Sequence, residues 1–127
     1  MSKSMVYVCS PLSAETVPEM RRSMHNARRL MIEVAAETGK RAVAPHAFLP
    51  EFLDDDDPEE RELALEIGTM LLKNCCCLIV CAEKLSKGMQ AEINQAKALG
   101  IPVVRRVAPH IYLDSPVIST DFKRKEA

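Results

Sequence analysis

The chain has no tryptophan and only three phenylalanines and two tyrosines among its 127 residues. A protein that stacks single-stranded nucleic acid on aromatic side chains needs more rings than these. Basic charge is not in excess either, because 17 lysines and arginines face 18 aspartates and glutamates, which gives a formal net charge of -1. We therefore expect no duplex nucleic acid partner, since binding to a duplex rests on neutralising its phosphates with lysine and arginine.

Long hydrophobic runs are also missing. No apolar stretch approaches the roughly 20 residues that span a bilayer, and the N-terminal residues MSKSMVYVCS lack the hydrophobic segment of a signal peptide. The cysteines, five in number, do not form the pattern of a secreted disulfide framework. We therefore expect a cytoplasmic protein without a membrane partner.

Four of the cysteines lie close together, in the pattern C-C-C-x-x-x-C over residues 75–81. Zinc sites typically use C-x-x-C pairs or histidines at fitting spacing. In a strand, Cys75, Cys77 and Cys81 would point to one face and Cys76 to the other. We interpret them as small apolar residues of a buried strand. A metal or redox site is the alternative, and we predict no metal.

Short β-branched or apolar runs alternate with helical patterns along the chain. Strands are expected at 5–9, 41–45, 75–82 and 101–104, and helices at about 16–39, 57–71 and 87–99. No clear periodicity follows residue 106. This alternation predicts an α/β fold in a single domain: a flavodoxin- or Rossmann-like three-layer sandwich with a four- to five-stranded, mainly parallel sheet in the order 2-1-3-4.

Local signals support the helix starts. Thr16 and Glu19 read as a capping box, and Asp57 followed by Pro58 as an N-cap and first helical residue. We expect the segment from His46 to the acidic run at 54–57 to be a loop. The buried stripes are predicted at Met20, Met24, Ala27, Leu30, Met31, Val34 and Ala35 in the first helix and at Leu63, Ile67, Met70 and Leu71 in the second.

The most informative motif is S-x-G-x-x-x-E, formed by Ser86, Gly88 and Glu92 after the third strand. In an open α/β sheet, ligands bind at the carboxyl ends of the strands, where the strand order reverses. A carboxylate near a helix N-terminus is favoured in its ionised form, which suits a nucleophile in glycosyl transfer. The alternative is purely local: Ser86 caps the helix and Glu92 is a favourable acid near its start.

Three segments together resemble the nucleoside 2-deoxyribosyltransferase superfamily, which includes the deoxyribonucleoside 5′-monophosphate N-glycosidases. They are Met5–Pro11 (MVYVCSP), Ala44–Asp54 (APHAFLPEFLD) and Leu85–Gly100 (LSKGMQAEINQAKALG). The resemblance covers about residues 5–105. It implies one such domain over 1–127, with this core and a C-terminal tail at 106–127.

The resemblance also implies roles for individual residues. Glu92 would be the nucleophile that attacks C1′ of a deoxyribose, and Tyr7 would orient this nucleophile or the sugar. A nucleoside or nucleotide would be the small-molecule partner, bound by Ser10, Pro11, Ser13, His46, Ser86, Gly88 and Met89. Relatives act as homodimers or larger homo-oligomers in which a neighbouring subunit completes the active site. They use no metal and no organic cofactor.

The chain departs from its relatives at the acid/base positions. The relatives' strand-end aspartate is matched by Ser86, and a further carboxylate in the helix before the third strand is matched by Gly68. The group that protonates the leaving base is therefore open, with Glu83, Asp54 and His46 as candidates.

The first loop departs as well, because Ser13 and Ala14 stand where relatives carry an Arg-Gly pair. Arg21, Arg22 or Lys87 would have to replace the phosphate-binding arginine. Two functions follow from the sequence: an enzyme acting on N-glycosidic bonds, or a non-catalytic protein that senses or sequesters a nucleotide.

Overall fold

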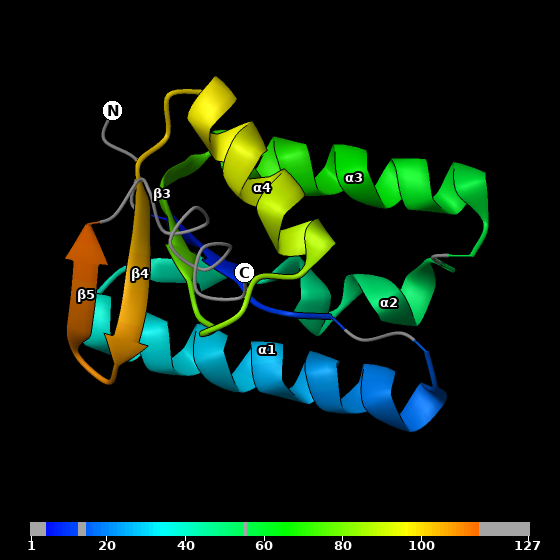
Figure 1. The fold of residues 1–127 in the computed structure, drawn as a ribbon, viewed down its shortest axis with the longest axis horizontal. Helices are drawn as coiled ribbons and strands as arrows, with labels where there is room; N and C mark the ends of the chain where they lie inside the picture. The colour runs from blue at the N-terminus through cyan, green and yellow to red at the C-terminus, as the bar shows by residue number, and fades with distance from the viewer. Residues whose placement is uncertain (1–4, 13–14, 55, 115–127) are drawn as a thin grey trace, which may run out of the picture.

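A computed structural model describes residues 5–12, 15–54 and 56–114 (Figure 1). Its sheet has five strands in the order β2-β1-β3-β4-β5. The strands are β1 (Met5–Cys9), β2 (Arg41–Val43), β3 (Cys75–Val80), β4 (Val103–Ala108) and β5 (Ile111–Asp114). The first four run parallel, and β5 pairs antiparallel with β4. The predicted α/β fold and strand order are confirmed.

Helices cover both faces of the sheet (Figure 1). On one face, α1 (Val17–Thr38) packs Ala27, Leu30 and Val34 against side chains of β1 and β3. On the other, α3 (Pro58–Lys73) and α4 (Lys87–Ala98) enclose a second core with Tyr7 and Cys9 of β1. Because β1 leads to α1 and β3 leads to α4, the chain leaves these neighbouring strands toward opposite faces. This reversal places the expected ligand crevice at their carboxyl ends.

The predicted helix starts are confirmed. The Thr16 hydroxyl oxygen accepts a hydrogen bond from the N–H of Glu19 (3.2 Å), and the Asp57 carboxylate accepts one from the N–H of Glu59 (2.9 Å). At the end of α1, Gly39 has φ of 70°, and its N–H donates to the Ala35 carbonyl (3.0 Å). Glycine adopts this left-handed conformation without a steric cost, so the helix ends there.

Two predictions about the middle of the chain are wrong. The segment from His46 is not a plain loop, because η1 (Pro45–Ala47) and the one-turn helix α2 (Leu49–Phe52) form there. Both helices have a proline in the first turn. Proline is favourable there, because the first N–H groups of a helix make no hydrogen bond within the helix. The predicted buried stripe of α3 is wrong at two of its four positions: Leu63 is 45% exposed and Met70 is 65% exposed, whereas Ile67 and Leu71 are half-buried.

The cysteines of β3 do not alternate as predicted. Met5 pairs with Cys75 and Val6 with Cys77, so Cys76 is an extra residue in β3 that reverses the alternation. Cys75 therefore lies with the α3 and α4 core, while Cys76, Cys77 and Cys81 pack against the α1 core. The cysteines fill core positions as interpreted from the sequence. Within the described part of the chain, no group of three or more His, Cys, Asp or Glu side chains is placed to hold a metal ion.

The predicted tail contains regular structure in its first part. The fourth strand extends to Ala108, and β5 follows after a turn in which His110 has φ of 66°. The rest of the predicted tail, residues 115–127, lies outside the described residues. Among the residues described, no helix is long and apolar enough to cross a membrane.

A buried polar cluster joins the β4–β5 hairpin to α1. The Arg106 guanidinium donates to Glu37 at 2.6 and 3.0 Å and to Glu33 at 2.9 Å. Glu37 also accepts hydrogen bonds from the Tyr112 hydroxyl (2.6 Å) and from the His110 N–H (3.0 Å). One carboxylate thus fixes both strands of the hairpin to the helix.

Candidate functional site

The candidate site lies where β1 meets α4. Tyr7 and Cys9 are alternate residues of β1, so both point to the face that α4 covers. Glu92 stands in the second turn of α4 and reaches back toward them. The Tyr7 hydroxyl donates a hydrogen bond to Oε2 of Glu92, and the Cys9 thiol donates one to Oε1 at 3.4 Å. The structure therefore brings together the predicted nucleophile and the predicted orienting tyrosine.

Electrostatics at Glu92 differ from the expectation based on its helix position. Burial raises the pKa of Glu92 above its ordinary value, and this outweighs the lowering of that pKa by His46, Tyr7 and Cys9. Burial, rather than position on the helix, therefore has the larger effect on the pKa of this carboxyl. Burial, followed by the charge of Glu92, raises the pKa of Tyr7 and of Cys9 far above their ordinary values. Both groups stay neutral and act as hydrogen-bond donors to the carboxylate.

A second part of the site is formed by the ends of β1 and β2. His46 of η1 places Nδ1 2.9 Å from the Ser10 carbonyl oxygen. Since a carbonyl oxygen only accepts hydrogen bonds, Nδ1 carries the proton and Nε2 is the nitrogen left for chemistry. Ser10 is 1% exposed, and its hydroxyl has no hydrogen-bond partner in the described part of the chain. Pro11 follows and is half-buried, whereas Ser13 lies outside the described residues.

The start of α4 supports the local interpretation of Ser86. Its hydroxyl oxygen accepts the N–H of Met89 at 3.2 Å and thus caps the helix. Met89 is fully buried in the core, and its carbonyl oxygen lies 4.0 Å from the Cys9 sulfur. Gly88 is exposed, and the nearest atom to an added Cβ would be Ser86 Oγ at 4.0 Å. There is open space above Gly88 for a ligand to approach the backbone.

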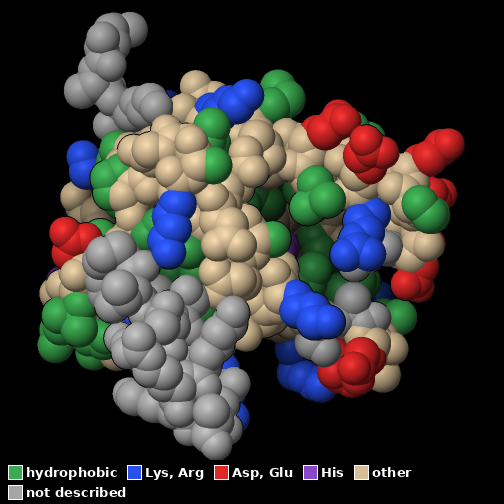
Figure 2. Space-filling view, turned by 45° about the horizontal axis from the view of Figure 1, so that its top comes forward, with side chains coloured by type: hydrophobic (Ala, Val, Ile, Leu, Met, Phe, Trp, Pro, Cys, Tyr) green, Lys and Arg blue, Asp and Glu red, His purple; other side chains and the backbone are tan. Residues whose placement is uncertain are grey.

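Gly68 of α3 also borders the site. A Cβ built at this position would lie 3.5 Å from the Tyr7 hydroxyl oxygen, an ordinary van der Waals distance. A side chain at position 68, where the relatives implied by the resemblance carry a carboxylate, would therefore lie next to the Tyr7–Glu92 pair. Figure 2 shows the molecule hollowed on the side of α2 and α3, with hydrophobic side chains on the floor of the hollow and charged side chains around it.

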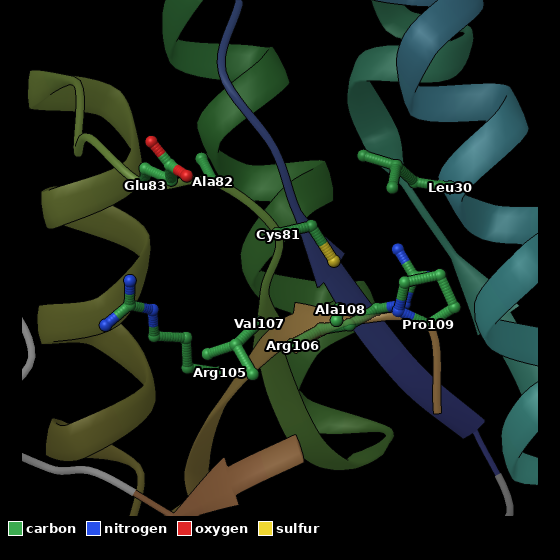
Figure 3. A pocket seen from close by; sticks show the side chains of 9 residues that line it. All are labelled: Leu30, Cys81, Ala82, Glu83, Arg105, Arg106, Val107, Ala108 and Pro109. Carbon is green, nitrogen blue, oxygen red and sulfur yellow. The ribbon is translucent and has the colours of Figure 1, made fainter. Parts of the chain in front are cut away.

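Two other hollows differ from this site. One of about 290 Å³ lies at the carboxyl ends of β3 and β4 and is lined by Cys81, Arg106 and neighbouring residues (Figure 3). Its Arg106 is already engaged by Glu33 and Glu37, so we do not place the chemistry there. The other, of about 180 Å³, is lined by Arg21, Met24, His25, Arg28 and Glu51. Among the basic residues predicted to bind a substrate phosphate, Arg21 lines this second hollow. Lys87 is exposed in the first turn of α4.

Cys9 is not among the site residues predicted from the sequence. The signal was available, because Cys9 stands two positions after Tyr7 and shares its face in any strand. The contact between His46 and the Ser10 carbonyl had no such signal, since it joins loops that are far apart in the sequence.

Comparisons with known proteins agree with this architecture. Residues 4–106 match the family described as "Domain of unknown function (DUF7768)". The solved structure of a 2-deoxyribosyltransferase from the psychrotolerant bacterium Bacillus psychrosaccharolyticus is similar, with a TM-score of 0.59 and 16% sequence identity, over 80% of this chain and 70% of that chain. This likeness shows a shared fold. No curated protein matches the sequence.

Proposed function

The chain belongs to the DUF7768 family, and we propose that it cleaves the N-glycosidic bond of a deoxynucleoside or a deoxynucleoside 5′-monophosphate. The deoxyribosyl group passes either to water or to a second base. The observation that carries this proposal is the Glu92 carboxylate, held between two neutral donors at the carboxyl end of β1. The fold shared with a 2-deoxyribosyltransferase supports it.

In the proposed reaction, an oxygen of ionised Glu92 attacks C1′ of the deoxyribose. The bond between C1′ and the base nitrogen breaks, and the base leaves with the electron pair and takes up a proton. The product is a covalent ester between the sugar and Glu92. Water or a second base nitrogen then attacks C1′ and releases the carboxylate, while the attacking atom gives up its proton. Tyr7 holds Oε2 throughout the reaction.

We propose His46 as the donor of the proton to the leaving base. Its Nδ1–H is committed to the Ser10 carbonyl, which fixes the ring and leaves Nε2 to carry the transferable proton. The positive charge of His46 also lowers the pKa of Glu92 and so opposes the effect of burial. One group would therefore keep the nucleophile ionised and protonate the leaving base.

A His46→Asn variant separates these roles, because the Asn amide can still donate to the Ser10 carbonyl but holds no transferable proton. We expect kcat to fall about a hundredfold for natural purine nucleosides, the usual scale of general acid catalysis. The loss should be much smaller for a substrate whose leaving group departs as a stable anion. Steady-state rates of product release with both substrates check this. An equal loss with both would assign His46 to packing.

Substrate binding is supported by the buried, unpartnered hydroxyl of Ser10. Burying a hydroxyl without a hydrogen bond has a free-energy cost of about 1–3 kcal/mol. A polar atom of the bound sugar or of its 5′ group would satisfy it. The proposed substrate site also includes Pro11, Ser13, Ser86, Gly88 and Met89. Ser86 and Met89 act indirectly, because they determine the conformation at the start of α4.

We also propose that the functional form is a homodimer or a larger homo-oligomer with a shared active site. Two of the three exposed large apolar side chains of α3, Leu63 and Met70, fall on the face that the sequence pattern marks as buried. A second copy of the chain would cover it. We expect light scattering after size-exclusion chromatography to give at least twice the chain mass, and Leu63→Glu with Met70→Glu to reduce it. The exposed Glu66→Gln variant serves as the control. A monomeric wild-type protein would contradict this.

The alternative is a non-catalytic nucleotide-binding protein, favoured by the absence of carboxylate side chains at Ser86 and Gly68. Base release from a panel of deoxynucleosides and monophosphates, with and without an acceptor base, decides between the two. Release that requires Glu92 supports the enzyme. Thermal stabilisation by a nucleotide without any release supports the binding protein.

A further inference from the structure

Cys9 makes a contact that core packing alone does not require. Its thiol is fully buried and lies 3.4 Å from Oε1 of Glu92, whereas Oε2 accepts the Tyr7 hydroxyl. Both donors come from one face of β1, and they meet the two oxygens of one carboxylate. A residue that only filled space would not need a polar atom directed at the nucleophile.

We propose that Cys9 is a positioning residue that holds Oε1 of Glu92 and makes Oε1 the oxygen that attacks C1′. This inference rests on the proposed function. Two contacts are needed to fix a carboxylate, because one hydrogen bond leaves it free to rotate. A thiol is a weaker donor than a hydroxyl. Oε1 therefore keeps more electron density than Oε2 and can release the thiol at little cost as the bond to C1′ forms.

Three groups outside α4 act on the charge of Glu92 in the described part of the chain: Tyr7 and Cys9 from β1, and His46 from η1. Each favours the ionised carboxylate over the protonated carboxyl. Removing the Cys9 donor should therefore move the titration of Glu92 to higher pH. The Cys9 thiol itself stays protonated, because burial raises its pKa.

The test compares Cys9→Ala with Cys75→Ala. Cys75 is a thiol in the same core cluster that donates to the Leu71 carbonyl (3.3 Å). The Glu92 side chain is titrated by ¹³C NMR in glutamate-labelled protein, with Glu92→Gln to assign its signal. In Cys9→Ala we expect the titration to move to higher pH, and base release on the acid side to fall about threefold, as for loss of one weak hydrogen bond. Cys75→Ala should destabilise the fold without moving the titration.

An unchanged Glu92 titration in Cys9→Ala would overturn the positioning role, whatever happens to stability. A titration that moves in both cysteine variants would overturn it too, because the cause would then be general loosening of the core. The NMR readout does not depend on turnover. If the titration moves only in Cys9→Ala but no nucleoside releases its base, the contact to Glu92 stands and the proposed function fails. In a crystal structure of a trapped adduct, an ester at Oε1 would support the assignment of the attacking oxygen and one at Oε2 would overturn it.

Discussion

Glu92→Gln is expected to lower base release at least about a thousandfold, the scale on which enzymes lose activity with their nucleophile, and to raise the unfolding temperature at neutral pH. Both effects have one cause, an ionised carboxylate held in a buried site. The folded-state pKa of Glu92 is raised, so its contribution to stability is present at low pH and is lost as the pH rises through that pKa. Glutamine resembles the protonated carboxyl and avoids this loss.

The measurement is thermal unfolding of wild type and Glu92→Gln over a range of pH, beside base-release assays. The two unfolding temperatures should converge at acid pH, where Glu92 is protonated in both states, and separate above it. Glu66→Gln, an exposed position on α3, controls for the removal of one negative charge. A variant that loses activity and also unfolds earlier at neutral pH would show that Glu92 is a structural residue.

Glu37→Ala is expected to destabilise the fold by about 3 kcal/mol, because it removes the buried partner of Arg106 and leaves only the partly exposed Glu33 to balance that charge. Arg106 and Glu37 have side chains only 8% and 7% exposed. The variant also removes the acceptor for the Tyr112 hydroxyl and the His110 N–H. Chemical denaturation checks the free energy of unfolding. Glu33→Ala is the matched control, since Glu33 is 34% exposed and should lose about 1 kcal/mol or less.

The same carboxylate predicts how stability depends on pH. Hydrogen bonds from Arg106, with Tyr112, His110 and the Arg106 charge, lower the pKa of Glu37 to about 2. The stability it contributes is present above the ordinary glutamate range and is lost as the pH falls toward 2. Glu37→Ala should remove most of this acid dependence. An unchanged acid profile would show that Glu37 does not control it.

The sequence predicted the parts of the fold that depend on local periodicity. Alternating strand and helix patterns and the caps at Thr16, Asp57 and Gly39 predicted the elements and the layers, and the strand order was expected from the fold class that this alternation indicates. The prediction that Leu63 and Met70 of α3 are buried was wrong, because helical spacing shows that a face is apolar but not whether another part of the chain covers it. The cysteine alternation failed because a single extra residue, Cys76, reverses every later position of β3, and local sequence does not mark a bulge.

The candidate site was predictable to a similar degree. Resemblance paired Tyr7 with Glu92, and the structure joins them by a hydrogen bond. The alternation of side chains along a strand would by itself have placed Cys9 on the same face as Tyr7. The protonation preference of Glu92 was not predictable, because position on a helix is a property of the sequence, whereas burial depends on the packing of β1 against α4. The contact of His46 with Ser10 likewise depends on tertiary structure.

The central claim is that Glu92 forms a covalent bond with the sugar. The direct measurement is mass spectrometry of the protein after incubation with a 2-deoxy-2-fluoro-arabinosyl nucleoside, whose adduct hydrolyses slowly. We expect the intact mass to increase by one fluorinated sugar, with the added mass on the peptide that contains Glu92. Glu92→Gln should show no adduct. Base release from the natural nucleosides without an adduct, or an adduct on any other residue, would contradict the role of Glu92.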